Sequence, residues 1–150
     1  MFPDLVFQIT NPLALIGWVL LLFAPLIPKW SDRIAGYAIP ALLALIYAIM
    51  LVTHAGDGEG GFGSLAEVMS LFTVPGLVMA GWLHYLAFDL FIGAWEVRTA
   101  RREGIAHWMV IPCLALTLFA GPIGLLLFLA IRSIRKRTSP DPAPARGVPK

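Results

Sequence analysis

The chain has 150 residues with a formal net charge of +2, and 59% of them are hydrophobic while only 13% are charged. A soluble domain carries about 25% charged residues, so this composition and a mean hydropathy of +0.81 indicate a membrane protein. The small net charge argues against nucleic acid as a partner. The lone cysteine, Cys113, cannot form an internal disulfide.

Four apolar stretches are long enough to cross a bilayer, which takes about 20 apolar residues in a helix. They are residues 5–28, 34–53, 68–88 with a pattern that continues to Trp95, and 108–131. Backbone polar groups in lipid must be satisfied within such a segment. The sequence therefore predicts an all-α fold, an integral membrane bundle of four transmembrane helices within residues 1–137, with the lipid bilayer as its surroundings.

The connecting segments carry helix signals of their own. Ser64 and Glu67 match a capping box, in which each side chain bonds the backbone amide of the other residue. This predicts a short interfacial helix, Leu65 to Phe72, before the third span. Gly104 is a predicted helix stop, and the proline-rich tail, residues 138–150, is expected to be disordered.

Basic residues indicate the orientation, because Lys and Arg in short loops mark the cytoplasmic side. Lys29 to Arg33 reads as a tight basic turn after the first span, and nothing basic precedes that span. The N-terminus is therefore expected outside. The segment that begins with Met1 has no basic region typical of a signal peptide, which points to a bacterial inner membrane.

The last basic cluster, Arg132 to Arg137, conflicts with this orientation if all four spans cross completely. A fold-back at residues 120–122 would remove the conflict but would leave backbone groups unsatisfied unless protein covers them. The interpretation favoured here is a complete fourth span that is kinked at Pro122.

The third span holds the candidate site, His84, Tyr85 and Asp89. An ionisable group near mid-membrane costs several kcal/mol unless it is paired or protonated, so a functional role is the default hypothesis. His84 and Asp89 lie about 140° apart around the helix and should face different neighbours, whereas Tyr85, Asp89 and Glu96 share a face. Hydrogen bonds that only join helices are the structural alternative.

The remaining polar residues have simpler interpretations. Glu96 is expected at the inner interface, paired with Arg101 or water, and Arg98, Arg101 and Arg102 are interpreted as topology signals. His107 is interpreted as an interface anchor. No cofactor or metal is expected, because the three histidines fall at different depths and no cluster has zinc spacing.

The chain resembles the neoxanthin synthase-like membrane proteins, the abscisic-acid-deficiency type, which are small four-helix proteins of plants and bacteria. The resemblance covers nearly the whole chain up to Arg132. Its most specific part is residues 84–93, His-Tyr-Leu-Ala-Phe-Asp-Leu-Phe-Ile-Gly, supported by residues 102–107 and 112–126.

This resemblance implies carotenoid chemistry, since plant members are required to convert violaxanthin to neoxanthin. That reaction is an isomerisation that opens an epoxide, and an acid and a base suffice for it. The resemblance makes His84 and Asp89 the residues to test. The leading hypothesis takes Asp89 as acid, His84 as base or orienting group and Tyr85 as a helper, acting on or holding a carotenoid-like polyene.

Two further hypotheses remain open. One is a non-catalytic subunit that binds pigment or lipid and packs against other membrane protein subunits. The other is a small proton or solute carrier, with His84 and Asp89 as its relay.

Overall fold

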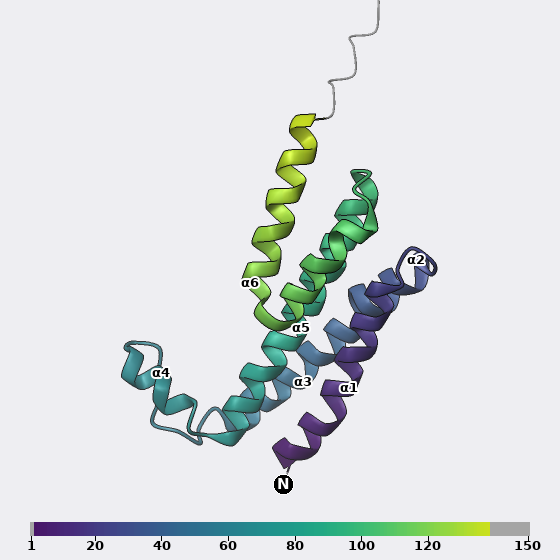
Figure 1. Cartoon of the computed structure of the whole chain (residues 1–150). Coiled ribbons are helices and arrows are strands. Elements are labelled where there is room, and N and C mark those ends of the chain that lie inside the picture. The colour runs from purple at the N-terminus through teal and green to yellow at the C-terminus, as the bar shows by residue number, and fades with distance from the viewer. Residues whose placement is uncertain (1, 139–150) are drawn as a thin grey trace, which may run out of the picture.

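All regular elements of residues 2–138, the part of the chain that the computed structural model describes, are helices (Figure 1). Four segments are long and apolar enough to cross a membrane, which confirms the predicted fold class. They are α1 (Phe2–Leu22), a second segment of α2 (Pro28–Trp30), η1 (Ser31–Ala38) and α3 (Ile39–His54), then α5 (Pro75–Arg102) and α6 (His107–Thr138). The predicted disordered tail lies outside the described residues beyond Thr138.

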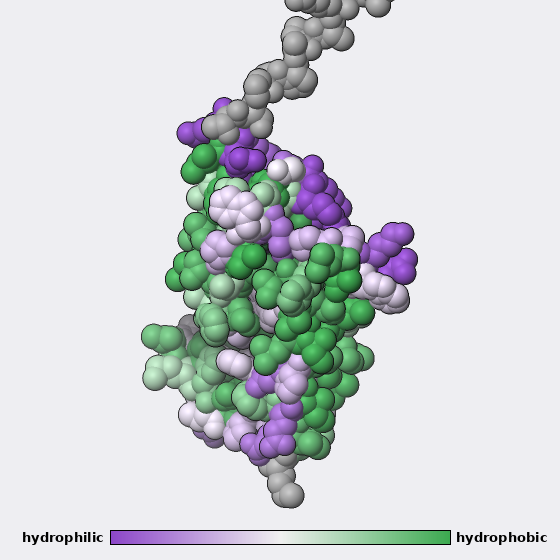
Figure 2. All heavy atoms as spheres, turned by 45° about the vertical axis from the view of Figure 1, so that its right-hand side comes forward, coloured by the Kyte–Doolittle hydropathy of each residue, from purple (hydrophilic) through white to green (hydrophobic). Residues whose placement is uncertain are grey.

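The surface of the bundle is apolar. Leu26, Val52 and Phe119 are each more than three-quarters exposed, and Figure 2 shows apolar residues across the middle of one face with hydrophilic residues gathered towards its ends. Apolar patches this large are rare on soluble monomers. The helices therefore imply a lipid environment.

Helix α5 lies at the centre and packs against α1, α3 and α6. Glycines allow the close approach: a Cβ on Gly17 would meet the Leu90 side chain, and one on Gly93 would meet Trp18. Leu83 and Leu90 of α5 are fully buried. These contacts fix the position of α5 within the bundle. All candidate site residues, His84, Tyr85 and Asp89, belong to this helix.

The short interfacial helix forms as α4 (Leu65–Leu71), capped by Ser64, whose hydroxyl accepts a hydrogen bond from the Glu67 amide (3.2 Å). The reciprocal half of the capping box differs from the prediction. The Glu67 carboxylate accepts from the Gly63 amide (3.1 Å) rather than from Ser64. No residue of α4 is buried, and Met69 is exposed, as an interfacial position requires.

The second segment begins earlier than predicted. Pro28 occupies the first helical turn, where its fixed φ and missing N–H are tolerated. Lys29 and Arg33, read from the sequence as a tight turn, are therefore helical, and the turn lies before them at residues 23–27. Residues Ser31–Ala38 form a π-helix, a geometry often found at functional sites.

Helix α6 does not run straight, which corrects the expected complete span. Ala120 has non-helical backbone angles (φ −153°, ψ 52°), and the chain beyond it runs back beside the first limb (Figure 1). The Arg132 side chain thereby bonds Glu103 (Nε–Oε2 2.8 Å), whereas an unbroken helix would carry Arg132 about 37 Å from His107. We call residues 107–138 the α6 hairpin.

The hairpin explains the charge pattern that conflicted with four complete crossings. Its return brings the final basic cluster to the end of the molecule where α2 begins and α5 ends (Figure 1). Within residues 2–138 every Lys and Arg lies at or within one helical turn or so of this basic end: Lys29, Arg33, Arg98, Arg101, Arg102, Arg132, Arg135, Lys136 and Arg137.

Candidate functional site

One face of α5 carries Tyr85, Asp89 and Glu96, and all three meet the α6 hairpin. We call it the acidic face. Tyr85 contacts Leu118, Asp89 lies against Gly121, and Glu96 bonds Thr117. The predicted sharing of one face is thus confirmed, because helical spacings of four and seven stack side chains on one side.

Tyr85 completes the backbone hydrogen bonding of the hairpin. In a continuous helix the Leu118 carbonyl would accept from the amide of residue 122, but Pro122 has no N–H. The Tyr85 hydroxyl donates to the Leu118 carbonyl instead. Protein therefore covers the backbone group that a fold-back leaves open, which is the condition for irregular backbone at membrane depth.

Asp89 lies at the tip of the hairpin, beside Gly121. A Cβ at position 121 would collide with the Asp89 carboxyl group, so glycine is what allows the close approach. Oδ2 of Asp89 is buried and has no hydrogen-bond partner among residues 2–138. A buried polar atom without a partner is uncommon in proteins.

Glu96 is fully buried, which corrects its expected solvated position at the inner interface. The Thr117 hydroxyl donates to Oε1 (3.2 Å), while Oε2 has no partner in the described part of the chain. Arg101, the expected partner of Glu96, pairs with Asp32 instead. The error arose because α6, through Thr117 on the first limb of the hairpin, covers this part of α5, and spacing along α5 does not reveal that cover.

His84 lies on a different face of α5. Its ring is stacked on Phe88, with centroids 4.5 Å apart, and meets Tyr47 edge-on at 5.7 Å. The residue is exposed. The prediction that His84 and Asp89 face different neighbours is confirmed, and the structure does not bring His84 together with the acidic face.

A cavity of about 730 Å³ lies between the start of α1 and the first half of α5. Ligand pockets typically measure about 300–1,000 Å³ and combine apolar walls with a few polar groups. This cavity fits that description, and Tyr85 both lines it and belongs to the acidic face. It is lined by Pro3, Asp4, Phe7, Phe72, Thr73, Pro75, Val78, Met79, Gly81, Trp82 and Tyr85.

An apolar groove of about 340 Å³ runs along the opposite side of α5, between it and η1 and α3. Arg98, interpreted from the sequence as a topology signal, lies beside this groove and is only 9% exposed. Its guanidinium carbon lies 5.1 Å from the Tyr37 ring centroid and 5.7 Å from that of Phe91. Sequence reasoning missed this site, although the spacing of Phe88, Phe91 and Arg98 already places them on one face.

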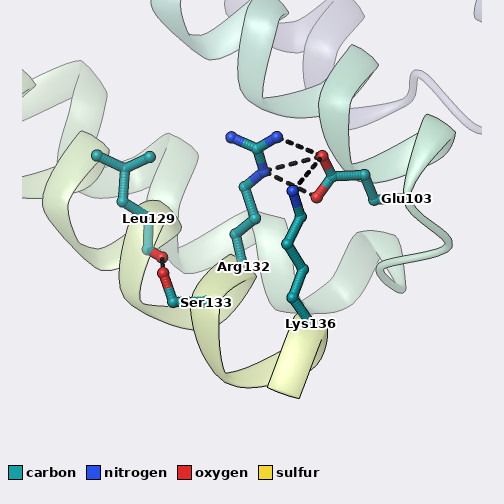
Figure 3. Close-up of polar contacts among 5 residues, drawn as sticks. All are labelled: Glu103, Leu129, Arg132, Ser133 and Lys136. Atoms are coloured by element: carbon teal, nitrogen blue, oxygen red, sulfur yellow. Dashed lines mark hydrogen bonds and ion pairs between the residues drawn. The ribbon is translucent and has the colours of Figure 1, made fainter. Parts of the chain in front are cut away.

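A charged cluster closes the base of the hairpin (Figure 3). Arg132 donates hydrogen bonds to the Glu103 carboxylate from two of its nitrogens, Nε and Nη2. Lys136 Nζ lies 3.5 Å from Glu103 Oε1. The hydrogen bonds from Arg132 lower the pKa of the Glu103 carboxyl group below its ordinary value. Gly104 next to it has a positive φ of 68° and directly follows the end of α5, as predicted for a helix stop.

The other histidines serve as structural contacts. His107 Nε2 donates to the Leu22 carbonyl (2.9 Å) and joins the start of α6 to the end of α1, while His54 Nδ1 lies 2.9 Å from the Met50 carbonyl oxygen. Within residues 2–138 no three His, Cys, Asp or Glu side chains gather as they would around a metal ion.

Fold and site together define a small helical multi-pass membrane protein with acidic residues buried under a helical hairpin. The chain matches the ABA DEFICIENT 4-like family over residues 5–128 and belongs to that family, which confirms the resemblance to neoxanthin synthase-like proteins. The family is related to carotenoids and neoxanthin. No curated protein and no solved structure matches the chain.

Proposed function

We propose that this protein acts on a carotenoid-like polyene, with Asp89 as the acid–base group and Tyr85 as its helper. The observation that carries the proposal is a cavity that Tyr85 helps to line, with Asp89 one helical turn further along α5 and its buried Oδ2 without a partner among residues 2–138. Membership of the ABA DEFICIENT 4-like family supports the choice of ligand.

The cavity suits one end group of the ligand rather than its whole length. A polyene of about 30 Å matches the thickness of the hydrocarbon core, so its chain extends along the helices while an end ring enters beside Trp82 and Tyr85. The protonated Asp89 carboxyl group gives its proton to the epoxide oxygen as the C–O bond breaks. The carboxylate then takes a proton from carbon, so no redox partner is needed.

His84 enters this proposal differently from the sequence hypothesis. It is exposed on the other face of α5 and stacks on Phe88. Within one chain the His84 side chain therefore cannot contact a ligand group that is bound beside Tyr85. The proposed chemistry rests on Asp89 and Tyr85.

The test is pigment analysis in a host that makes violaxanthin. The wild-type chain is expected to convert it to an allenic isomer of equal mass, which chromatography separates. Asp89→Asn keeps the size and polarity but removes the acid, and should lower conversion about 100-fold or more. Tyr85→Phe should lower it less, and His84→Ala, as the control, should leave it unchanged.

The same experiment decides between this proposal and its rivals. Pigment that copurifies unchanged from the wild type and from Asp89→Asn would establish a binding subunit instead. Proton flux through reconstituted vesicles without any pigment change would establish a carrier. Loss of conversion in His84→Ala but not in Asp89→Asn would refute the assignment of the acid.

We also propose that the basic end faces the cytoplasm and that the N-terminus lies on the opposite side. The support is the bias of Lys and Arg in short loops to the cytoplasmic side, together with the gathering of the described Lys and Arg at one end. The opposite end carries acidic residues, among them Asp57 and Glu67.

A further inference from the structure

The groove between α5 and the η1–α3 segment has the shape of an acyl-chain site. The η1–α3 wall consists of small residues and Tyr37, and the α5 wall carries Phe88 and Phe91. Most of the lining residues are exposed, so the groove opens to lipid. Its longer wall runs from Gly36 to Ala44, about 12 Å at 1.5 Å per residue, and the depth of one bilayer leaflet is about 15 Å. Arg98 lies beyond the Phe91 end of the groove, about two helical turns further along α5. The residues that define the groove are Gly36, Tyr37, Ala41, Ala44, Phe88 and Phe91.

Arg98 lies at the basic end of this groove with part of its hydrogen-bonding capacity unused. Its Nη1 is buried beside Gly36 and has no hydrogen-bond partner among residues 2–138. The rings of Tyr37 and Phe91, which line the groove, hold the guanidinium between them. A guanidinium stays charged, and burying a charge without a counter-charge is unfavourable.

The acidic groups at this end are already engaged by other cations. Asp32 pairs with Arg101, and Glu103 pairs with Arg132 and Lys136. Glu96 lies on the acidic face and bonds Thr117. None of these acidic side chains forms an ion pair with Arg98, so a counter-charge from outside the described residues would be favourable there.

We propose that this groove binds an anionic phospholipid, with the phosphate on Arg98 and one acyl chain along α5 towards Phe88. A phospholipid places its phosphate at the membrane surface and its acyl chain one leaflet deep, which matches the positions of Arg98 and the groove. Exposed cations of α2 and η1, Lys29 and Arg33, attract anionic headgroups. The site lies across α5 from Tyr85 and Asp89 and is independent of the proposed carotenoid chemistry.

The test is native mass spectrometry of the full chain in detergent, titrated with phosphatidylglycerol or with phosphatidylcholine of the same acyl chains. Wild type is expected to bind one phosphatidylglycerol more tightly than phosphatidylcholine. Arg98→Gln should weaken phosphatidylglycerol binding about tenfold or more, because a charge-assisted contact to phosphate is lost. Arg102→Gln removes an exposed charge from the same helix end and should change binding no more than about twofold.

Ala44→Phe tests the acyl-chain part, since it fills the groove and leaves Arg98 in place. It should abolish tight binding of the long-chain lipid, and it decides the matter if Arg98→Gln does not fold. Binding unchanged in both variants would overturn the proposal and indicate loosely associated lipid only. Competition by inorganic phosphate as effective as the lipid would also overturn it, as would a lipid-free dimer that Ala44→Phe dissociates.

Discussion

The two sides of α5 bury polar groups in different ways. On the acidic face, the chain's own α6 hairpin covers Tyr85, Asp89 and Glu96 and supplies hydrogen bonds from or to residues 117 and 118. On the groove side, Arg98 is as deeply buried as a core residue, yet only aromatic rings face its charge. The comparison shows that the protein supplies hydrogen bonds to part of the acidic face, although Asp89 Oδ2 and Glu96 Oε2 have no partner among residues 2–138, whereas Arg98 on the groove side forms no hydrogen bond or ion pair with the described residues.

This difference follows from what covers each side. The α6 hairpin places a backbone carbonyl and a hydroxyl opposite α5, whereas η1 and α3 present mainly Gly, Ala and Pro to it. Small apolar residues leave space and offer no hydrogen bonds. Arg98 on that side therefore lacks hydrogen bonds to the described residues, while Tyr85 and Glu96 form theirs with the hairpin.

The largest expected effect is the side of the membrane from which a cysteine in the returning limb of the hairpin can be labelled. Labelling from a given side is expected to be either complete or absent. With Cys113→Ser as background, single cysteines at Ser133 and Trp30 should react with an impermeant maleimide from the same side of sealed vesicles. A cysteine at Asp57 should react only from the other side. Reaction of the Ser133 position together with the Asp57 position would mean that α6 crosses completely and that the acidic face lacks this cover.

The next effect concerns packing between the two limbs of the hairpin. A Cβ at Gly124 would meet the Thr117 hydroxyl, the Thr117 amide nitrogen and the Cys113 carbonyl oxygen. Because backbone does not yield as a side-chain end does, Gly124→Ala should lower the free energy of unfolding in detergent by about 3 kcal/mol. Gly56→Ala is the matched control, since a Cβ there meets nothing within 4 Å.

The smallest effect concerns the charged cluster at the hairpin base. The lowered pKa of Glu103 means that its ionised form is favoured by folding, so this stabilisation is complete above the ordinary pKa of 4.5. The stabilisation by ionised Glu103 is lost as the pH falls through the lowered pKa that this carboxyl group has in the folded protein. Thermal unfolding from pH 7 downwards should lose part of its pH dependence in Glu103→Gln and in Arg132→Gln, while an unchanged profile would contradict the role of the pair.

Several site features were predictable because they depend on one helix alone. The angular separation of His84 and Asp89, and the shared face of Tyr85, Asp89 and Glu96, follow from 100° per residue and agree with their neighbours in the structure. The burial of Glu96 and Arg98 was not predictable in this way. Both lie near the charged end of α5, where composition suggests water, and only the packing of α6 and η1 removes them from it.

The sequence by itself determined the four long apolar helices, the cap at Ser64 and the stop at Gly104, because transfer into lipid and backbone hydrogen bonding act locally. It also determined which residues of α5 share a side. The tertiary structure alone decided that α6 turns back at Ala120. A Pro122 kink and a complete reversal are both compatible with the local sequence, and contacts of Tyr85 with Leu118 and of Glu103 with Arg132, far apart in the chain, select the reversal.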